Sequence, residues 1–197
     1  MIDTPHGPAR AHLYAPDREP KAALMLGHGA GGGFKGRDLQ AATKVARDLG
    51  YLVVHVEQPY LVAGRRSAAP THQLDAAWLA VFEHLRGEAL AGLPLVSGGR
   101  SSGARVACRT AAATSAVAVL CLAFPVHPPG RPEKSRLDEL DGVEVPVLVI
   151  QGQADPFGMP PDAPGREVVA VPGTHSFSAA GIGPLTEAAH AFLRRTI

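Results

Sequence analysis

Short apolar runs, rich in Val, Leu and Ile, recur along the chain. Most of them are continuously apolar rather than alternating, which is typical of strands buried on both faces of a parallel sheet. The expected strands are residues 22–26, 51–56, 93–97, 117–122, 145–150 and 167–171. Residues 9–14 alternate between apolar and polar side chains, so we expect a weaker strand there, at an edge of the sheet.

Helical spacing fills the intervals between these runs. Residues 38–49 and 74–90 repeat apolar side chains every three or four positions, and Gly50 follows the first of them as a C-terminal stop. Further helices are expected at residues 102–113, 133–140 and 185–195. Because strands and helices alternate, the pattern predicts a doubly wound, mostly parallel α/β sheet of about seven strands. In such sheets, ligand chemistry collects at the carboxyl ends of the strands.

Composition narrows the class of protein. A length of 197 residues suits a single domain, residues 1–197, and 46% hydrophobic with 19% charged residues is an ordinary globular balance. The net charge is +1 and the basic residues are scattered, so we expect no nucleic-acid partner. No apolar run approaches the roughly 20 residues that cross a bilayer, and the first residues carry no signal segment. We therefore expect a cytoplasmic monomer or homodimer without a membrane partner.

The two cysteines, Cys108 and Cys121, lie among apolar residues. A disulfide framework would need more cysteines, and the C-x-x-C spacing of metal sites is absent. We expect two buried thiols, and neither a metal nor a cofactor.

Residues 99–103 read Gly-Arg-Ser-Ser-Gly and separate the expected strand 93–97 from the expected helix 102–113. A nucleophilic serine on a strained strand-to-helix turn needs glycines two residues to either side, because side chains there would collide with neighbouring backbone. Ser101 meets this requirement and Ser102 does not. The N–H of Ser102, at the start of the helix, can stabilise an oxyanion. The alternative is a Gly/Ser-rich loop that merely caps the helix.

A glycine-rich loop, His-Gly-Ala-Gly-Gly-Gly at residues 28–33, directly follows the expected strand 22–26. Successive glycines let the backbone turn its N–H groups into a cavity. The N–H of Ala30 is the expected second oxyanion donor, with that of Gly31 next. A phosphate-binding loop is the alternative, but the Gly-Lys-Ser/Thr ending is missing, and the nearest acidic partner for a ribose, Glu57, comes too late.

A serine nucleophile needs a general base and an acid that orients it. Asp155 directly follows a predicted buried strand, within residues 151–156; its alternative role is to open a turn before the next proline. His175 follows the last predicted strand, where it can accept the Ser101 proton while Asp155 fixes its tautomer. His127 also ends a strand and is the alternative base, or a residue of the pocket.

With these segments in place, the chain resembles the α/β-hydrolase superfamily over nearly its whole length. More narrowly, it is similar to small bacterial proteins labelled dienelactone-hydrolase-like, which are related to the Tex30 and NSL-complex subunit group. The narrower resemblance rests on residues 26–32, 58–66, 124–130, 151–158 and 175–177. It implies a Ser101–Asp155–His175 triad and hydrolysis of an ester-like bond. A true dienelactone hydrolase would carry a cysteine nucleophile, so Ser101 departs from that enzyme.

The candidate pocket lies around these residues. Residues 58–71 form the longest unpatterned stretch near the catalytic edge, and we expect them to form a small rim or lid. No insertion after the strand 117–122 is large enough for a cap domain, so we expect a shallow, open site in a minimal α/β-hydrolase fold. The pocket candidates are His28, Gly31, Tyr60, Arg65, Arg66, Arg100, His127 and Phe157. The arginines favour an anionic substrate or, in the plainer interpretation, pair with surface acids.

The residues favour a hydrolase of carboxylic esters or thioesters that acts on a small or extended molecule. A non-catalytic binding or scaffold protein with the same fold is the alternative from another class, although a scaffold would need none of Ser101, Asp155 and His175. An acyltransferase or peptidase is also open, because the acceptor that attacks the acyl-enzyme decides the outcome.

Overall fold

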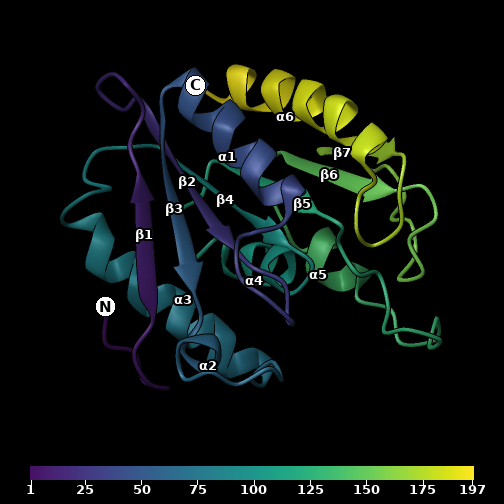
Figure 1. Ribbon diagram of the computed structural model, residues 1–197, viewed down its shortest axis with the longest axis horizontal. Helices are drawn as coiled ribbons and strands as arrows, with labels where there is room; N and C mark the ends of the chain where they lie inside the picture. The colour runs from purple at the N-terminus through teal and green to yellow at the C-terminus, as the bar shows by residue number, and fades with distance from the viewer.

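The computed structural model, which describes residues 1–197, contains a seven-stranded sheet in the order β1-β3-β2-β4-β5-β6-β7 (Figure 1). β1 (Arg10–Tyr14) lies at one edge and is antiparallel to β3, while all other neighbours are parallel. The remaining strands are β2 (Ala22–Gly27), β3 (Tyr51–Glu57), β4 (Leu95–Arg100), β5 (Ala118–Leu122), β6 (Val147–Gly152) and β7 (Arg166–Val171). The doubly wound sheet and its alternating edge strand, both predicted from the hydrophobic pattern, are confirmed.

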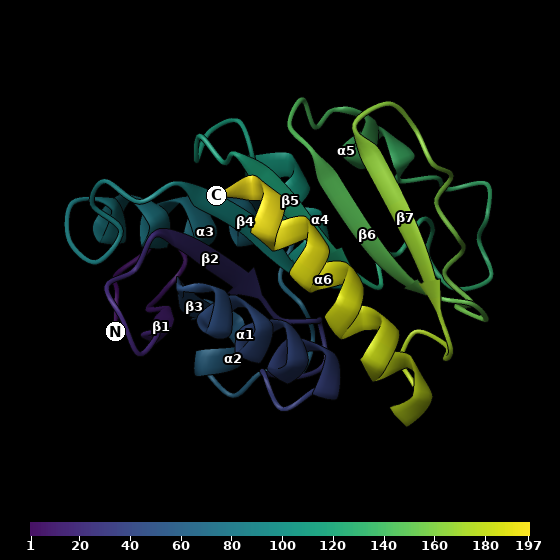
Figure 2. The same ribbon diagram turned by 90° about the horizontal axis from the view of Figure 1, so that it is seen from above.

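Helices cover both faces of the sheet (Figures 1 and 2). α1 (Arg37–Leu49) and α6 (Ile182–Thr196) lie side by side on one face. The opposite face is covered by α3 (Thr71–Arg86), α4 (Ser102–Thr110) and α5 (Leu137–Asp141). The segment between β5 and β6 contains only α5, so the fold is minimal and has no cap domain. None of these helices combines the length and the apolar character needed to cross a bilayer.

Some boundaries differ from those expected from the sequence. β4 continues to Arg100 rather than ending at residue 97, because the glycines that follow stay in parallel register with β5. α3 ends at Arg86, since Gly87 stops it four residues earlier than predicted. The stretch 58–71 is not wholly irregular: it begins with a short helix, α2 (Pro59–Val62), whose proline is suited to a first helical turn. A 3₁₀ turn, Ala179–Gly181, also precedes α6.

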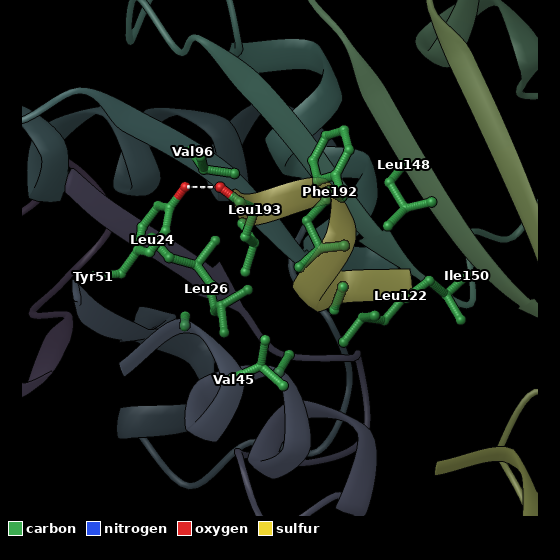
Figure 3. Close-up of a cluster of buried hydrophobic side chains, with 14 of the residues drawn as sticks. Leu24, Leu26, Val45, Tyr51, Val96, Leu122, Leu148, Ile150, Phe192 and Leu193 are labelled. Atoms are coloured by element: carbon green, nitrogen blue, oxygen red, sulfur yellow. Dashed lines mark hydrogen bonds between the residues drawn. The ribbon is translucent and has the colours of Figure 1, made fainter. Parts of the chain in front are cut away.

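The larger core fills the space between the sheet and the α1–α6 pair (Figure 3). Leu26, Val45 and Phe192 come from β2, α1 and α6 and are buried together. Each such side chain contributes about 1.5–3 kcal/mol by leaving water. The Tyr51 hydroxyl donates a 2.8 Å hydrogen bond to the Leu193 carbonyl, which ties β3 to the last helix. This core fixes the start of α1 and the segment before α6, both of which flank the carboxyl edge of the sheet.

The two cysteines are buried free thiols, as the sequence predicts. Cys108 on α4 and Cys121 on β5 place their Sγ atoms 3.5 Å apart. The hydrogen bond between the thiols and their burial raise the pKa of Cys121, so this thiol stays protonated at neutral pH.

The backbone of α4 packs so closely against the backbones of β2 and β4 that the contact positions can hold only glycine. A Cβ atom on Gly99 would lie 2.6 Å from the carbonyl carbon of Gly103. A Cβ atom on Gly103 would collide with the carbonyl oxygen of Gly27. β2, β4 and α4 therefore meet backbone to backbone, which brings the first turn of α4 over the carboxyl ends of β2 and β4.

A buried histidine lies beside the glycine-rich loop. The ring of His55 stacks on Phe34 with 4.1 Å between centroids, and its Nε2 lies 2.7 Å from Thr43 Oγ1. Thr43 donates its own hydroxyl proton to the Leu39 carbonyl, so Nε2 of His55 donates to the Thr43 oxygen. Burial, together with the nearby His12, lowers the pKa of His55 to about 4. His55 is therefore neutral in the folded protein at neutral pH.

The close contact of Gly103 with Gly27 leads to a prediction about stability. Replacing Gly103 by Ala should lower the free energy of unfolding by about 1–3 kcal/mol, because the added methyl group meets backbone that cannot move aside. Urea denaturation measures this change. Gly183→Ala in α6 is the matched control: no atom lies within 4 Å of its Cβ, so this variant should gain about 0.5–1 kcal/mol of helix stability. A Gly103→Ala protein as stable as the wild type would contradict the packing.

The His55 site makes a prediction about pH. The unfolded chain binds a proton near the ordinary pKa of 6.5 and the folded chain only near 4, so stability is complete above pH 6.5 and falls as the pH drops towards 4. The loss should reach about 3 kcal/mol at pH 4. His55→Phe keeps the aromatic stacking and removes the titration. Denaturation at several pH values should therefore give a smaller acid loss for this variant, and equal losses would contradict the assignment.

Candidate active site

Ser101 lies between the last residue of β4 and the first residue of α4, in a conformation that side chains rarely adopt. Its φ is 53° and its ψ is −110°. Such strain costs about 1–3 kcal/mol and persists where the surroundings enforce it. The Ser101 N–H donates a 2.9 Å hydrogen bond to the Leu122 carbonyl at the end of β5. This bond and the glycine contacts beneath α4 hold the turn, which lifts the serine side chain above the sheet edge.

Asp155 and His175 reach Ser101 from the loops after β6 and β7. Nε2 of His175 lies 2.9 Å from Ser101 Oγ, and Nδ1 lies 2.9 Å from Asp155 Oδ2. Gly152, the last residue of β6, makes this approach feasible, because a Cβ atom there would collide with the Thr174 carbonyl oxygen. The structure thus brings together the three residues that the sequence singles out as nucleophile, acid and base.

The Asp155 carboxylate is held by several donors at once. Its side chain is 1% exposed, and Oδ1 accepts the Phe157 N–H at 2.9 Å. Oδ2 accepts both His175 and the amide of Gln151, the latter at 2.9 Å. An acceptor in this position selects the His175 tautomer with its proton on Nδ1, which leaves Nε2 free to accept from Ser101. The Phe157 ring packs on that imidazole with centroids 4.2 Å apart.

Gln151 is a residue that the sequence reasoning did not single out. Its Nε2 also lies 3.0 Å from the Phe124 carbonyl oxygen and 2.8 Å from that of Gly158, so two N–H groups are shared among three acceptors and connect the loops after β5 and β6. Its position at the end of a buried, otherwise apolar strand was the available signal, because a polar side chain there needs partners.

Two backbone amides in the residues around the serine have no acceptor within the chain. The N–H groups of Ala30 and Ser102 donate no hydrogen bond within the chain. Both residues line the same cavity as Ser101. Donors in this arrangement are suited to stabilise a negatively charged oxygen next to the serine.

The glycine-rich loop that carries Ala30 is anchored from below. Nδ1 of His28 donates to the Gly29 carbonyl at 2.8 Å, and its Nε2 accepts the Gln58 N–H at 3.1 Å. Burial lowers the pKa of His28, which keeps the neutral form that these two bonds require. The Tyr60 hydroxyl donates to the Ala30 carbonyl at 3.0 Å, which orients the Ala30–Gly31 peptide so that the Gly31 N–H points away from Tyr60. His28 and Tyr60, predicted as pocket residues, therefore support the loop from beneath it.

Arg100 joins the nucleophile turn to the start of α1 and to the histidine loop. Its Nε donates to Asp38 Oδ2 at 2.8 Å, and its Nη2 donates to the His175 carbonyl at 2.8 Å. The Asp38 side chain is 5% exposed, so this ion pair is largely out of water. No sequence pattern pointed to Asp38, since an acid in the first turn of a helix is common.

A cavity of about 410 Å³ opens above Ser101 and His175. Of the eight predicted pocket residues, Gly31, Arg100 and Phe157 line it. Ala68 and Ala69 also line it, so the stretch 58–71 forms part of a rim, as expected.

The other predicted pocket residues lie elsewhere. Arg65 lines a separate cavity beside α2. Arg66 and His127 do not line the cavity above Ser101. Nδ1 of His127 bonds to the Pro128 carbonyl at 2.9 Å, whereas His175 makes the contact with Ser101 that a base requires.

The Arg100–Asp38 pair makes a stability prediction. Arg100→Met leaves the buried Asp38 carboxylate without a cationic partner, which should cost about 3–5 kcal/mol of unfolding free energy. Adding Asp38→Asn removes that charge but keeps an oxygen for the Leu39 N–H, so the double variant should recover more than half of the loss. Chemical denaturation of both variants gives the two values. A double variant as unstable as Arg100→Met alone would contradict the role of the buried charge.

Solved structures share this architecture along nearly their whole length. The chain is similar to an α/β serine hydrolase without lid from Xanthomonas campestris, with TM-score 0.75, 24% identity, and 98% and 92% of the two chains covered. It is similar to Est1E from Butyrivibrio proteoclasticus with ferulic acid bound, with TM-score 0.78, 18% identity, and 99% and 98% covered. It is also similar to dienelactone hydrolase from Anabaena variabilis, with TM-score 0.74 and 15% identity, and the match covers 98% of this chain and 94% of that one. At these identities the likeness concerns the fold.

Sequence comparison assigns the family. Comparison with curated protein sequences finds no match. The family described as an alpha/beta hydrolase domain matches residues 20–180, which is most of the chain. A serine on a strained turn after β4, with a histidine and an aspartate on the loops after β7 and β6, accords with that match. The chain belongs to the α/β-hydrolase family.

Proposed function

We propose that this α/β hydrolase cleaves carboxylic esters through an acyl-enzyme on Ser101. The observation that carries the proposal is the continuous hydrogen-bonded line from Ser101 Oγ through His175 to Asp155, with both contacts at 2.9 Å. A non-catalytic protein would have no need to keep these three side chains in register at a strained turn beside a cavity.

In the acylation step, Ser101 Oγ attacks the ester carbonyl carbon and its proton moves to Nε2 of His175. The positive charge on the imidazole is stabilised by Asp155, which remains ionised. The carbonyl oxygen gains the negative charge and is bound by the N–H groups of Ala30 and Ser102. When the tetrahedral intermediate collapses, the bond to the alkoxy oxygen breaks and His175 gives its proton to the leaving alcohol. The acyl group stays on Ser101.

Deacylation repeats these roles with water. His175 takes a proton from a water molecule as that water attacks the acyl carbonyl, and the same two N–H groups stabilise the second oxyanion. The proton then returns to Ser101 Oγ, and the carboxylic acid leaves.

Several features support a small or extended ester as the substrate. The cavity of about 410 Å³ is within the usual range for small-molecule sites, and no cap domain covers it. A similar structure contains ferulic acid, an organic acid of the kind that ester hydrolysis releases. Thioesters react by the same steps. The serine nucleophile differs from the cysteine that the dienelactone-hydrolase resemblance implies, so we do not assign a dienelactone as the substrate.

The proposal predicts that Ser101→Ala abolishes covalent labelling by a fluorophosphonate. The same variant should lower hydrolysis of para-nitrophenyl acetate by at least about 1,000-fold, because the remaining groups cannot form an acyl-enzyme. Ser67→Ala, an exposed serine of the rim segment, is the matched control and should label and react like the wild type. Gel fluorescence and nitrophenolate absorbance provide the two readouts.

A wild-type protein that neither labels nor hydrolyses esters, thioesters or amides would contradict the proposal and favour a non-catalytic binding protein. Acyl transfer to an added alcohol or amine in preference to water would instead identify an acyltransferase on the same serine.

A further inference from the structure

The cavity above Ser101 has a strongly one-sided charge. Three arginines line it, Arg100, Arg105 and Arg136, and none of its lining residues is an aspartate or a glutamate. The positive charge of these arginines would not strengthen the binding of a neutral ester. Only an arginine without an acidic partner is free to bind an anionic ligand.

Two of the arginines already have acidic partners. Arg100 pairs with the buried Asp38, as described above. Arg105, one helical turn after Ser101, donates two hydrogen bonds to the Glu139 carboxylate at 2.8 and 2.5 Å. Because the guanidinium groups of Arg100 and Arg105 already bind carboxylates, neither is available to bind an anionic group of the substrate.

The acidic residues near Arg105 form ion pairs with Arg105 and Arg109, and none of them pairs with Arg136. Glu139 is shared with Arg109, whose Nη1 lies 3.1 Å from it, and Arg109 also forms a two-pronged pair with Asp75. These acids therefore already serve two arginines.

Arg136 makes no side-chain hydrogen bond and no ion pair, although it is half-buried. Its backbone is fixed, because its N–H donates to the Val126 carbonyl at 2.7 Å and α5 begins at the next residue. Burial and the neighbouring cations Arg105 and Arg109 lower the pKa of Arg136, and Glu139 only partly offsets them. Arg136 thus lines the cavity, and the five donors of its guanidinium have no acceptor within the chain.

We propose that Arg136 determines specificity by binding a carboxylate of the substrate, so that the preferred ester carries a negative charge away from its reacting carbonyl. A planar guanidinium matches a carboxylate with two parallel hydrogen bonds, and partial burial strengthens them. This role differs from the one considered for Arg65, Arg66 and Arg100, which lie outside the cavity or are already paired. The inference rests on the proposed ester hydrolysis.

Two matched substrate pairs test the inference, one for each side of the ester bond. On the acyl side, mono-para-nitrophenyl glutarate is compared with the neutral para-nitrophenyl pentanoate. On the alcohol side, para-acetoxybenzoate is compared with the neutral para-tolyl acetate. Each pair differs mainly in the carboxylate, so the ratio of the two kcat/KM values isolates the recognition of charge.

The wild type should prefer the anionic ester in at least one pair. Arg136→Met should lower that ratio at least about tenfold while the neutral ester reacts as before, because the variant removes charge-assisted bonds and keeps an unbranched stem like that of arginine. Arg136→Lys should restore part of the preference. Arg131→Met is the matched control: this exposed arginine of the same loop does not line the cavity, so the ratio should not change.

A binding measurement separates this inference from the proposed function. Monomethyl glutarate should bind to Ser101→Ala in calorimetry, and Arg136→Met in that background should weaken binding at least about tenfold. Ester hydrolysis with an unchanged ratio in both pairs and unchanged binding would overturn the role of Arg136 and leave the proposed hydrolysis standing. A protein that cleaves no ester yet binds the ligand through Arg136 would contradict the hydrolysis and retain the carboxylate site.

Discussion

The backbone contact between β2, β4 and α4 is the constraint on which the site depends. Gly27, Gly99 and Gly103 leave no room for a side chain, so the helix begins directly above the ends of two parallel strands. That position forces the connecting residue, Ser101, into a strained conformation and exposes its hydroxyl at the sheet edge. It also places the first turn of α4, which carries the unbonded N–H of Ser102, next to Ser101. A single side chain at this crossing would move the serine and the helix together.

The loops at the carboxyl edge are joined by hydrogen bonds that cross between them. Gln151 connects the loops after β5 and β6, and Arg100 connects the nucleophile turn to α1 and to the loop of His175. His28 and Tyr60 do the same for the glycine-rich loop. Because most of these bonds end on backbone carbonyls or on a buried carboxylate, they fix positions without adding reactive groups. Ser101, His175 and the loop that carries Ala30 are thereby held in place before any ligand binds, and such preorganisation would lower the cost of reorganisation in the proposed reaction.

The sequence predicted the fold well because buried parallel strands leave a strong apolar signal, and the catalytic candidates lie directly at the strand ends. Ser101, Asp155 and His175 could be proposed from that placement together with the glycine spacing around Ser101 and the family resemblance. Asp38, Gln151 and Arg136 could not, because their roles arise from contacts between segments far apart in the chain. The arginines illustrate the limit: Arg65 and Arg66 looked suitable by their position in a loop, yet only the structure shows which arginines line the cavity and which of those has no acidic partner.

The central claim, that Ser101 forms a covalent acyl intermediate, is tested most directly by trapping that intermediate. Rapid mixing with para-nitrophenyl acetate, followed by acid quench and peptide mass analysis, locates the acetyl group and counts it. If Ser101 forms the acyl-enzyme, we expect an initial burst of about one nitrophenolate per chain and an acetyl group on the peptide that contains Ser101. Turnover without an acetylated Ser101, or with the acetyl group on another residue, would contradict it.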